Sequence, residues 1–91
     1  MTNETAITLA LSALSHIVGD ESLFERYVAL TGVSPDQMRD NLEEPDFMAA
    51  ILEFLLGNEP DLMAFCEATD TAPELPAIAW RTLGGGKGTY W

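Results

Sequence analysis

The chain has 91 residues, of which 15 are Asp or Glu and 4 are Lys or Arg, so its formal net charge at pH 7 is -11. This charge excludes a protein that holds nucleic acid by phosphate contacts, because lysine and arginine make those contacts. Apolar residues form 47% of the chain and charged residues 21%, a balance typical of one small folded domain rather than of an acidic disordered segment.

The only cysteine, Cys66, has no partner for an intramolecular disulfide, which favours a reducing compartment. Residues 1–5 contain Glu4 and no basic cluster, so they lack the charge pattern of a signal peptide. The apolar stretch 6–18 is too short and too polar to span a bilayer. We therefore expect a cytoplasmic protein with no membrane partner.

The first predicted helix begins at Asn3, which fits the N-cap position, and ends at Gly19. Large apolar side chains recur along it at helical spacing, namely at Ile7, Leu11, Leu14 and Val18. The spacing predicts that this stripe faces the core.

A second helix is predicted between Asp20, a candidate N-cap, and Gly32, which ends it. Glu21 in its first turn suits the positive end of the helix dipole. The residues expected to point inward are Leu23, Phe24, Tyr27, Val28 and Leu30.

The segment Ser34-Pro35-Asp36-Gln37 predicts a third helix, because Ser and Gln three residues apart form a capping box and Pro tolerates the first helical position. We expect this helix to run to about Leu42. Pro45 after Glu44 starts a fourth helix, whose apolar residues are Phe47, Met48, Ile51, Leu52, Phe54, Leu55 and Leu56. This helix is predicted to be central, covered by the first, second and fifth.

Gly57 ends the fourth helix, Asn58 caps the fifth, and Pro60 lies in the first turn of the fifth. The expected apolar face of the fifth helix is Leu62, Met63, Phe65 and Cys66. A last element follows Thr71, Pro73 and Pro76, and its expected buried residues are Leu75, Ile78, Ala79, Trp80 and Leu83. Strands are not expected, because apolar residues nowhere alternate with period two.

These elements predict an all-α fold, a compact orthogonal array of five or six short helices. The single domain is expected to cover residues 1–83. Residues 84–91 are glycine-rich and predict a flexible tail. Its last residues, Tyr90 and Trp91, either fold back onto the domain, engage a partner or stay in solvent.

Several segments resemble functional motifs, but each lacks a feature that the motif requires. The segment 84–89 resembles a phosphate loop, but Lys87 is followed by Gly88 rather than by Ser or Thr. Residues 28–38 have the outline of a helix-turn-helix, yet the helix from Ser34 would offer DNA mainly carboxylates. His16 and Cys66 are too few for a zinc site, and a thiol on the apolar face of a helix makes a poor nucleophile. We expect no catalytic residue, metal or cofactor.

Three segments carry a resemblance to a known family. They are Ala10-Leu11-x-Ala13-Leu14, then Phe24-x-x-Tyr27-Val28-Ala29-Leu30-Thr31-Gly32-Val33-Ser34-Pro35, and finally Glu44-Pro45-Asp46-Phe47 with Ile51-Leu52-Glu53-Phe54-Leu55-Leu56. Their order resembles that of short acidic helical proteins from alphaproteobacteria, a domain of unknown function. The resemblance implies a cytoplasmic bacterial helical domain and brings no activity or ligand.

The expected function is that of a non-enzymatic protein-interaction or regulatory adaptor whose acidic surface meets a basic partner. A phosphate mimic is one form of such an adaptor. The residues predicted for the surface are Asp36, Asp40, Glu43, Glu44, Asp46, Tyr90 and Trp91. One alternative is a homodimer joined through Met38, Leu42, Met63 and Trp80. A small-ligand-binding or enzymatic domain is the other.

Overall fold

The computed structural model describes residues 1–85, and in that range the chain forms six α-helices and no strand. The helices are α1 (Asn3–Val18), α2 (Glu21–Thr31), α3 (Pro35–Asp40), α4 (Pro45–Leu56), α5 (Glu59–Thr69) and α6 (Leu75–Thr82). The predicted all-α array of short helices is confirmed. The molecule measures 30 × 27 × 27 Å.

Three of the six helix starts, those of α2, α3 and α5, are set by the predicted caps. The Asp20 carboxylate accepts the backbone N–H of Leu23 at 3.1 Å, and the Asn58 side chain accepts that of Asp61 at 3.2 Å. At α3 the capping box closes in both directions, with Gln37 N–H to Ser34 Oγ at 3.2 Å and Ser34 N–H to Gln37 Oε1 at 2.9 Å. These caps satisfy backbone donors that a helix start leaves without a partner.

Two boundaries differ from the sequence predictions. The N-cap of α1 is Thr2 rather than Asn3, because Thr2 Oγ1 accepts the backbone N–H of Thr5 at 3.1 Å. Helix α3 ends at Asp40 rather than near Leu42, and Asn41 Nδ2 donates to the carbonyl of Gln37 at 2.7 Å. Leu42 therefore lies in the turn that leads to α4.

The core face of α1 is not the predicted one. It consists of Ala6, Ala10, Ala13, Leu14 and Ile17. From the expected stripe only Leu14 is buried, whereas Leu11 is 39% and Val18 51% exposed. Alanines bring the backbone of α1 close to α4 and α6, so the helix is rotated toward its small side chains, and Leu11 and Val18 are left outside.

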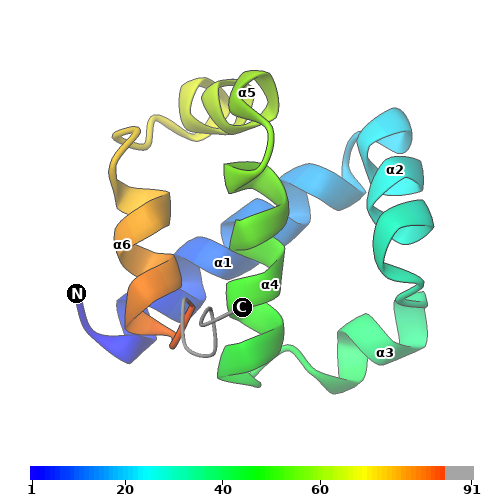
Figure 1. The fold of residues 1–91 in the computed structure, drawn as a ribbon, viewed down its shortest axis with the longest axis horizontal. Helices are drawn as coiled ribbons and strands as arrows, with labels where there is room; N and C mark the ends of the chain where they lie inside the picture. The colour runs from blue at the N-terminus through cyan, green and yellow to red at the C-terminus, as the bar shows by residue number, and fades with distance from the viewer. Residues whose placement is uncertain (86–91) are drawn as a thin grey trace.

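Helix α4 is central, as predicted, but its cover is different. Figure 1 shows α4 beside α6, with α1 crossing both, and α5 also packs on α4. The second helix packs mainly on α1 and reaches α4 through an edge-to-face contact between Tyr27 and Phe54, whose ring centroids are 5.2 Å apart. The predicted set of helices around α4 therefore omitted α6, whose start the sequence indicates only by scattered prolines.

Three further apolar residues lie differently from the expectation. Leu30 is 71% exposed and Met63 is 44% exposed, although both were expected to face the core. Met38 has the opposite outcome: it is 6% exposed and belongs to the core, so it is not available to a dimer interface. Helices α2 and α5 each bury a narrow face, centred on Leu23 and Tyr27 in α2.

The end of α6 uses two residues of the predicted tail. Gly84 has φ of 94° and donates its N–H to the carbonyl of Arg81 at 3.0 Å, while Gly85 donates to the carbonyl of Trp80 at 2.7 Å. These two bonds form a Schellman motif, which satisfies the last carbonyls of a helix. Residues 86–91, including Tyr90 and Trp91, lie outside the described residues.

Candidate functional site

The described part of the predicted acidic surface spans α3, the α3–α4 turn and the start of α4. Asp36 and Asp40 lie on α3, Glu43 and Glu44 lie in the turn, and Asp46 lies in the first turn of α4. All of them are exposed. Tyr90 and Trp91, the other two predicted residues, are outside the described range.

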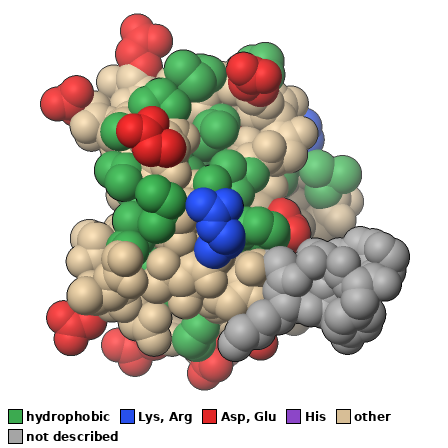
Figure 2. All heavy atoms as spheres, turned by 60° about the vertical axis from the view of Figure 1, so that its left-hand side comes forward, with side chains coloured by type: hydrophobic (Ala, Val, Ile, Leu, Met, Phe, Trp, Pro, Cys, Tyr) green, Lys and Arg blue, Asp and Glu red, His purple; other side chains and the backbone are tan. Residues whose placement is uncertain are grey.

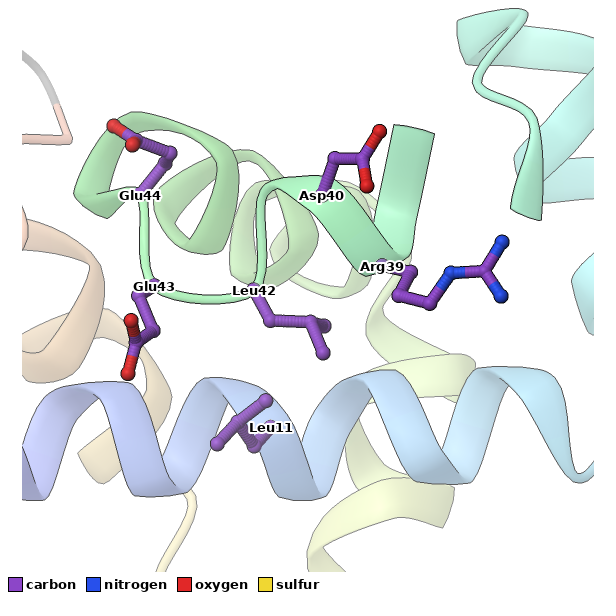
Figure 3. Close-up of a pocket in the computed structure, with 6 residues that line it drawn as sticks. All are labelled: Leu11, Arg39, Asp40, Leu42, Glu43 and Glu44. Carbon is purple, nitrogen blue, oxygen red and sulfur yellow. The ribbon is translucent and has the colours of Figure 1, made fainter. Parts of the chain in front are cut away.

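Three of these carboxylates line a hollow of about 440 Å³ between α1 and the α3–α4 turn. Its lining residues are Leu11, Arg39, Asp40, Leu42, Glu43 and Glu44. In Figure 3 the side chains of Leu42 and Glu43 point toward α1, and Leu42 faces Leu11. Asp40 and Glu44 point away from α1 in the same view. The hollow thus has an apolar floor and an acidic rim, which we call the acid-rimmed hollow.

The electrostatic balance of the acid-rimmed hollow is negative. Arg39, the one cation among the described lining residues, forms an ion pair with Asp36 one turn earlier on α3. Both side chains of that pair are largely exposed, so the pair contributes little to stability. Helix α1 brings no Lys or Arg to the hollow. Among residues 1–85, no other Lys or Arg lines the hollow beside the remaining carboxylates.

Local sequence explains why the turn projects these side chains together. The capping box fixes where α3 begins, and Asn41 ends it after six residues. Pro45 then starts α4, and the backbone N–H of Glu44 donates to the carbonyl of Asn41 at 3.0 Å. A turn held at both ends in this way presents Leu42, Glu43 and Glu44 at fixed positions.

The sequence predicted the rim residues of this hollow as part of an acidic surface, but it did not predict the floor residues Leu11 and Leu42. Leu11 was assigned to the core, and Leu42 was assigned to α3 and to a possible dimer interface. The signal that marks Leu11 as outside is the parallel run of Ala6, Ala10 and Ala13, which has the same helical spacing one residue earlier. An alanine stripe and a leucine stripe side by side offer two possible core faces.

A second hollow, of about 160 Å³, lies where α1, α2 and α5 meet. It is lined by His16, Asp20, Ser22, Leu23, Arg26, Asp61 and Ala64. Three of its polar residues are already engaged: Arg26 pairs with Asp61, Asp20 caps α2, and the Arg26 guanidinium lies 5.5 Å from the centroid of the Phe54 ring. The sequence did not group these residues. They join three helices, so we interpret the hollow as a structural junction.

The two residues with the most reactive side chains are also placed by packing. Cys66 is 4% exposed, and burial raises the pKa of its thiol, with the Glu74 carboxylate raising it further. The His16 ring packs edge-on against Phe65 with 5.6 Å between centroids. A nucleophilic cysteine needs a lowered pKa, so the direction found at Cys66 is the opposite of the one that activates a thiol.

A metal site or a membrane-spanning helix would be a further indication of function. Within residues 1–85 no three His, Cys, Asp or Glu side chains come together in a group that could hold a metal ion. None of the six helices in this range has the length and apolar character needed to cross a bilayer.

The face of the molecule that carries α6 contrasts with the acid-rimmed hollow. Figure 2 shows apolar side chains across the middle of this face, interrupted by a Lys or Arg side chain, with Asp and Glu at its margins. The half-buried residues Leu75, Ile78 and Trp80 of α6 and the exposed Arg81 belong to this helix. The carboxylates are therefore not concentrated here.

The sequence was compared with known proteins. The model of one protein family, described as "Protein of unknown function (DUF3572)", matches residues 3–86. Neither the curated proteins nor the solved structures contain a match to the chain. The resemblance to a domain of unknown function is thereby confirmed.

Proposed function

We propose that this chain, which belongs to the DUF3572 family of proteins of unknown function, is a non-enzymatic protein-interaction module that binds a basic surface of a partner protein. The observation that carries the proposal is the acid-rimmed hollow, whose lining combines the acidic residues Asp40, Glu43 and Glu44 with the apolar residues Leu11 and Leu42. Complementary charge of this kind speeds encounter with a basic partner and disfavours acidic ones.

The distribution of charge over the whole chain supports the same partner chemistry. All 15 acidic residues lie within residues 1–85, and in this range Arg26 and Arg39 are each paired with a carboxylate, Asp61 and Asp36. A second copy of the chain would carry the same net charge of -11 and repel the first, which favours a basic protein over a homodimer.

The non-enzymatic part of the proposal rests on how the reactive side chains are used. The Cys66 thiol is buried with a raised pKa, and the imidazole of His16 is packed against Phe65. Both residues therefore have structural positions. We propose a cytoplasmic location, because a lone buried thiol fits a reducing compartment, and an origin in bacteria of the alphaproteobacterial group, as the sequence resemblance implies.

The experiment is a comparative capture of partners with three tagged proteins: the wild type, a hollow variant and a matched control. The hollow variant is Asp40→Asn, Glu43→Gln, Glu44→Gln, and the Glu44 side chain makes no capping bond that this change would remove. The control is Glu53→Gln, Glu59→Gln, Glu67→Gln, which removes the same charge from exposed residues of α4 and α5.

We expect basic proteins that bind the wild type and the control at about 0.05 M NaCl, are lost at about 0.5 M NaCl, and are not retained by the hollow variant. Screening explains the salt effect, because exposed charge contacts weaken as the Debye length shortens. Equal capture by the hollow variant and the control would refute the proposed site, since total charge alone would then explain binding.

A further inference from the structure

The floor of the acid-rimmed hollow indicates what kind of basic surface fits it. Leu11 is 39% exposed at its base, although it lies on the longest helix of the described chain and is flanked by buried Ala10. Leu42 faces it from the α3–α4 turn (Figure 3). Two leucines across an open hollow leave apolar surface in water, and covering that surface is favourable.

The size of the hollow suits a protruding side chain rather than a flat surface. Its volume is about 440 Å³. This is within the range of pockets that hold small ligands, and it is ample for one large aliphatic or aromatic side chain with part of its backbone. Helices that dock in grooves use such side chains as anchors, spaced three or four residues apart.

The rim carboxylates differ in how they are placed to meet cations that flank such an anchor. Glu43 points toward α1, on the same side of the turn as Leu42, whereas Asp40 and Glu44 point away from α1 (Figure 3). Residues three or four apart on a docked helix lie about one turn, roughly 5 Å, from the anchor. Lysine or arginine at such a position would meet the Glu43 carboxylate beside the anchor, and Asp40 and Glu44 would add to the negative potential at the outer edge of the hollow.

We propose that the acid-rimmed hollow binds a basic amphipathic helix of the partner protein and takes one of its large apolar side chains between Leu11 and Leu42. This inference rests on the proposed function, because it presumes a basic partner. It adds that an apolar anchor, as well as charge, determines the recognition. Charge complementarity selects this occupant over an acidic helix or a second copy of the chain.

The test uses two synthetic peptides of about 14 residues, roughly four helical turns, built only from leucine and lysine. In the first peptide the leucines follow helical spacing, so that they form one apolar face. In the second the same residues are reordered so that the leucines are dispersed around the helix. Binding to ¹⁵N-labelled protein is followed by NMR, which gives both the affinity and the amides that shift.

Two single variants separate the anchor from the charge. Leu11→Gln removes the floor of the hollow on an exposed helix position without changing charge. Leu30→Gln is the matched control, because Leu30 is also an exposed helical leucine, at 71%, and does not line the hollow. The hollow variant Asp40→Asn, Glu43→Gln, Glu44→Gln tests the charge itself.

We expect the amphipathic peptide to shift the amides of Leu11, Leu42 and Glu43 and to bind the wild type and Leu30→Gln about tenfold more tightly than it binds Leu11→Gln, a difference of about 1.4 kcal/mol. The reordered peptide should bind these three proteins equally. If Leu11→Gln binds the amphipathic peptide as the wild type does, the anchor is refuted. The anchor is also refuted if sedimentation shows that the wild type is a dimer and Leu11→Gln is a monomer.

The same experiment distinguishes failure of the anchor from failure of the proposed function. Loss of both peptides by the hollow variant, without an effect of Leu11→Gln, would leave the basic partner standing and remove the anchor. Equal binding of both peptides by the hollow variant and the Glu53→Gln, Glu59→Gln, Glu67→Gln control would remove the proposed site, and the anchor with it.

Discussion

Gly32 and Gly57 both follow the last residue of a helix, but their backbones differ. Gly32 has φ of 71°, in the left-handed region, whereas Gly57 has φ of -76° and remains close to helical geometry. A Cβ on Gly32 would meet no atom within 4 Å, so its glycine is required by conformation alone. A Cβ on Gly57 would lie 3.4 Å from the carbonyl of Glu53, close to ordinary contact.

We therefore expect Gly32→Ala to lower the free energy of unfolding by about 1–2 kcal/mol, the usual cost of left-handed backbone for an L-residue. Gly57→Ala should leave it unchanged or raise it by about 0.5 kcal/mol, because alanine reduces the freedom of the unfolded chain. Urea denaturation of the two variants and the wild type measures both values. Equal destabilisation by both substitutions would contradict this difference between the glycines.

Two buried groups that lose a proton at alkaline pH, the Cys66 thiol and the Tyr27 hydroxyl, make the free energy of unfolding depend on pH in that range. Burial raises the pKa of Cys66 above 9.0, and Glu74 adds to the effect. Burial also raises the pKa of Tyr27 above 10.0, against the opposing effect of a hydrogen bond with Thr31. Both groups lose their protons more readily in the unfolded chain than in the folded one.

The expected consequence is a stability that is fully present below pH 9.0 and falls as pH rises through the raised pKa values, since the folded protein then binds more protons than the unfolded chain. Cys66→Ala should remove the part of the fall that begins near pH 9.0. Tyr27→Phe should remove the part that begins near pH 10.0. Urea denaturation at a series of pH values measures the slopes, and an unchanged slope in both variants would rule out these groups as its source.

At the scale of elements, the rotation of α1 has the largest effect on the site. Its alanine face packs on α4 and α6, and the same rotation leaves Leu11 at the edge of the acid-rimmed hollow. If the leucine stripe faced the core, the floor of the hollow would be lost. The packing of α1 and the shape of the candidate site are therefore two consequences of one arrangement.

Adjacent residues of α1 should accordingly differ in how much stability a substitution costs. Ala10→Leu should lower the free energy of unfolding by about 1–3 kcal/mol, because Ala10 is fully buried and extra methylenes overpack the core. Leu11→Ala should lower it by less than about 1 kcal/mol, because Leu11 is exposed and alanine is a better helix former. Chemical denaturation compares the two, and a larger loss for Leu11→Ala would mean that the leucine stripe faces the core.

Helix α3 illustrates how a short element can hold a site. It has six residues, and Met38 is its one buried side chain. The capping box, the Asn41 side chain and the start of α4 at Pro45 hold the rest of its geometry locally. The positions of the Asp40 and Glu43 carboxylates thus depend more on hydrogen bonds within this segment than on packing in the core.

At the scale of the whole molecule, a net charge of -11 on 91 residues produces self-repulsion that opposes folding. Salt screens this repulsion, so the melting temperature should rise between about 0.02 M and about 0.3 M NaCl. Removing three charges should reduce the rise equally in the hollow variant and in the Glu53→Gln, Glu59→Gln, Glu67→Gln control, because long-range repulsion depends mainly on total charge.

Thermal melts monitored by circular dichroism test this expectation. A salt response that differs strongly between the two triple variants would show that repulsion is concentrated at the acid-rimmed hollow. The pair also complements the binding experiments: stability is expected to follow the number of charges, and partner binding their position.

The sequence by itself determined the helices and most of their ends, because caps act within three or four residues. Asp20, Ser34 and Asn58 each accept a backbone N–H three residues later, and Gly32 ends α2 through its own backbone. Such local interactions are the same whatever surrounds them. The acidic rim was predictable for the same reason, since charged residues near a turn are exposed to solvent without needing a partner from elsewhere in the chain.

The tertiary structure alone decided which side of each helix is buried. Helix α1 carries alanine and leucine stripes side by side, and only its close approach to α4 and α6 selects the alanines. The burial of Met38 and the exposure of Leu30 and Met63 likewise depend on neighbouring elements. Burial is a property of what packs opposite a residue, and for the alanine face of α1 those residues lie in α4 and α6, which begin only at Pro45 and Leu75, where no local pattern in α1 can specify them.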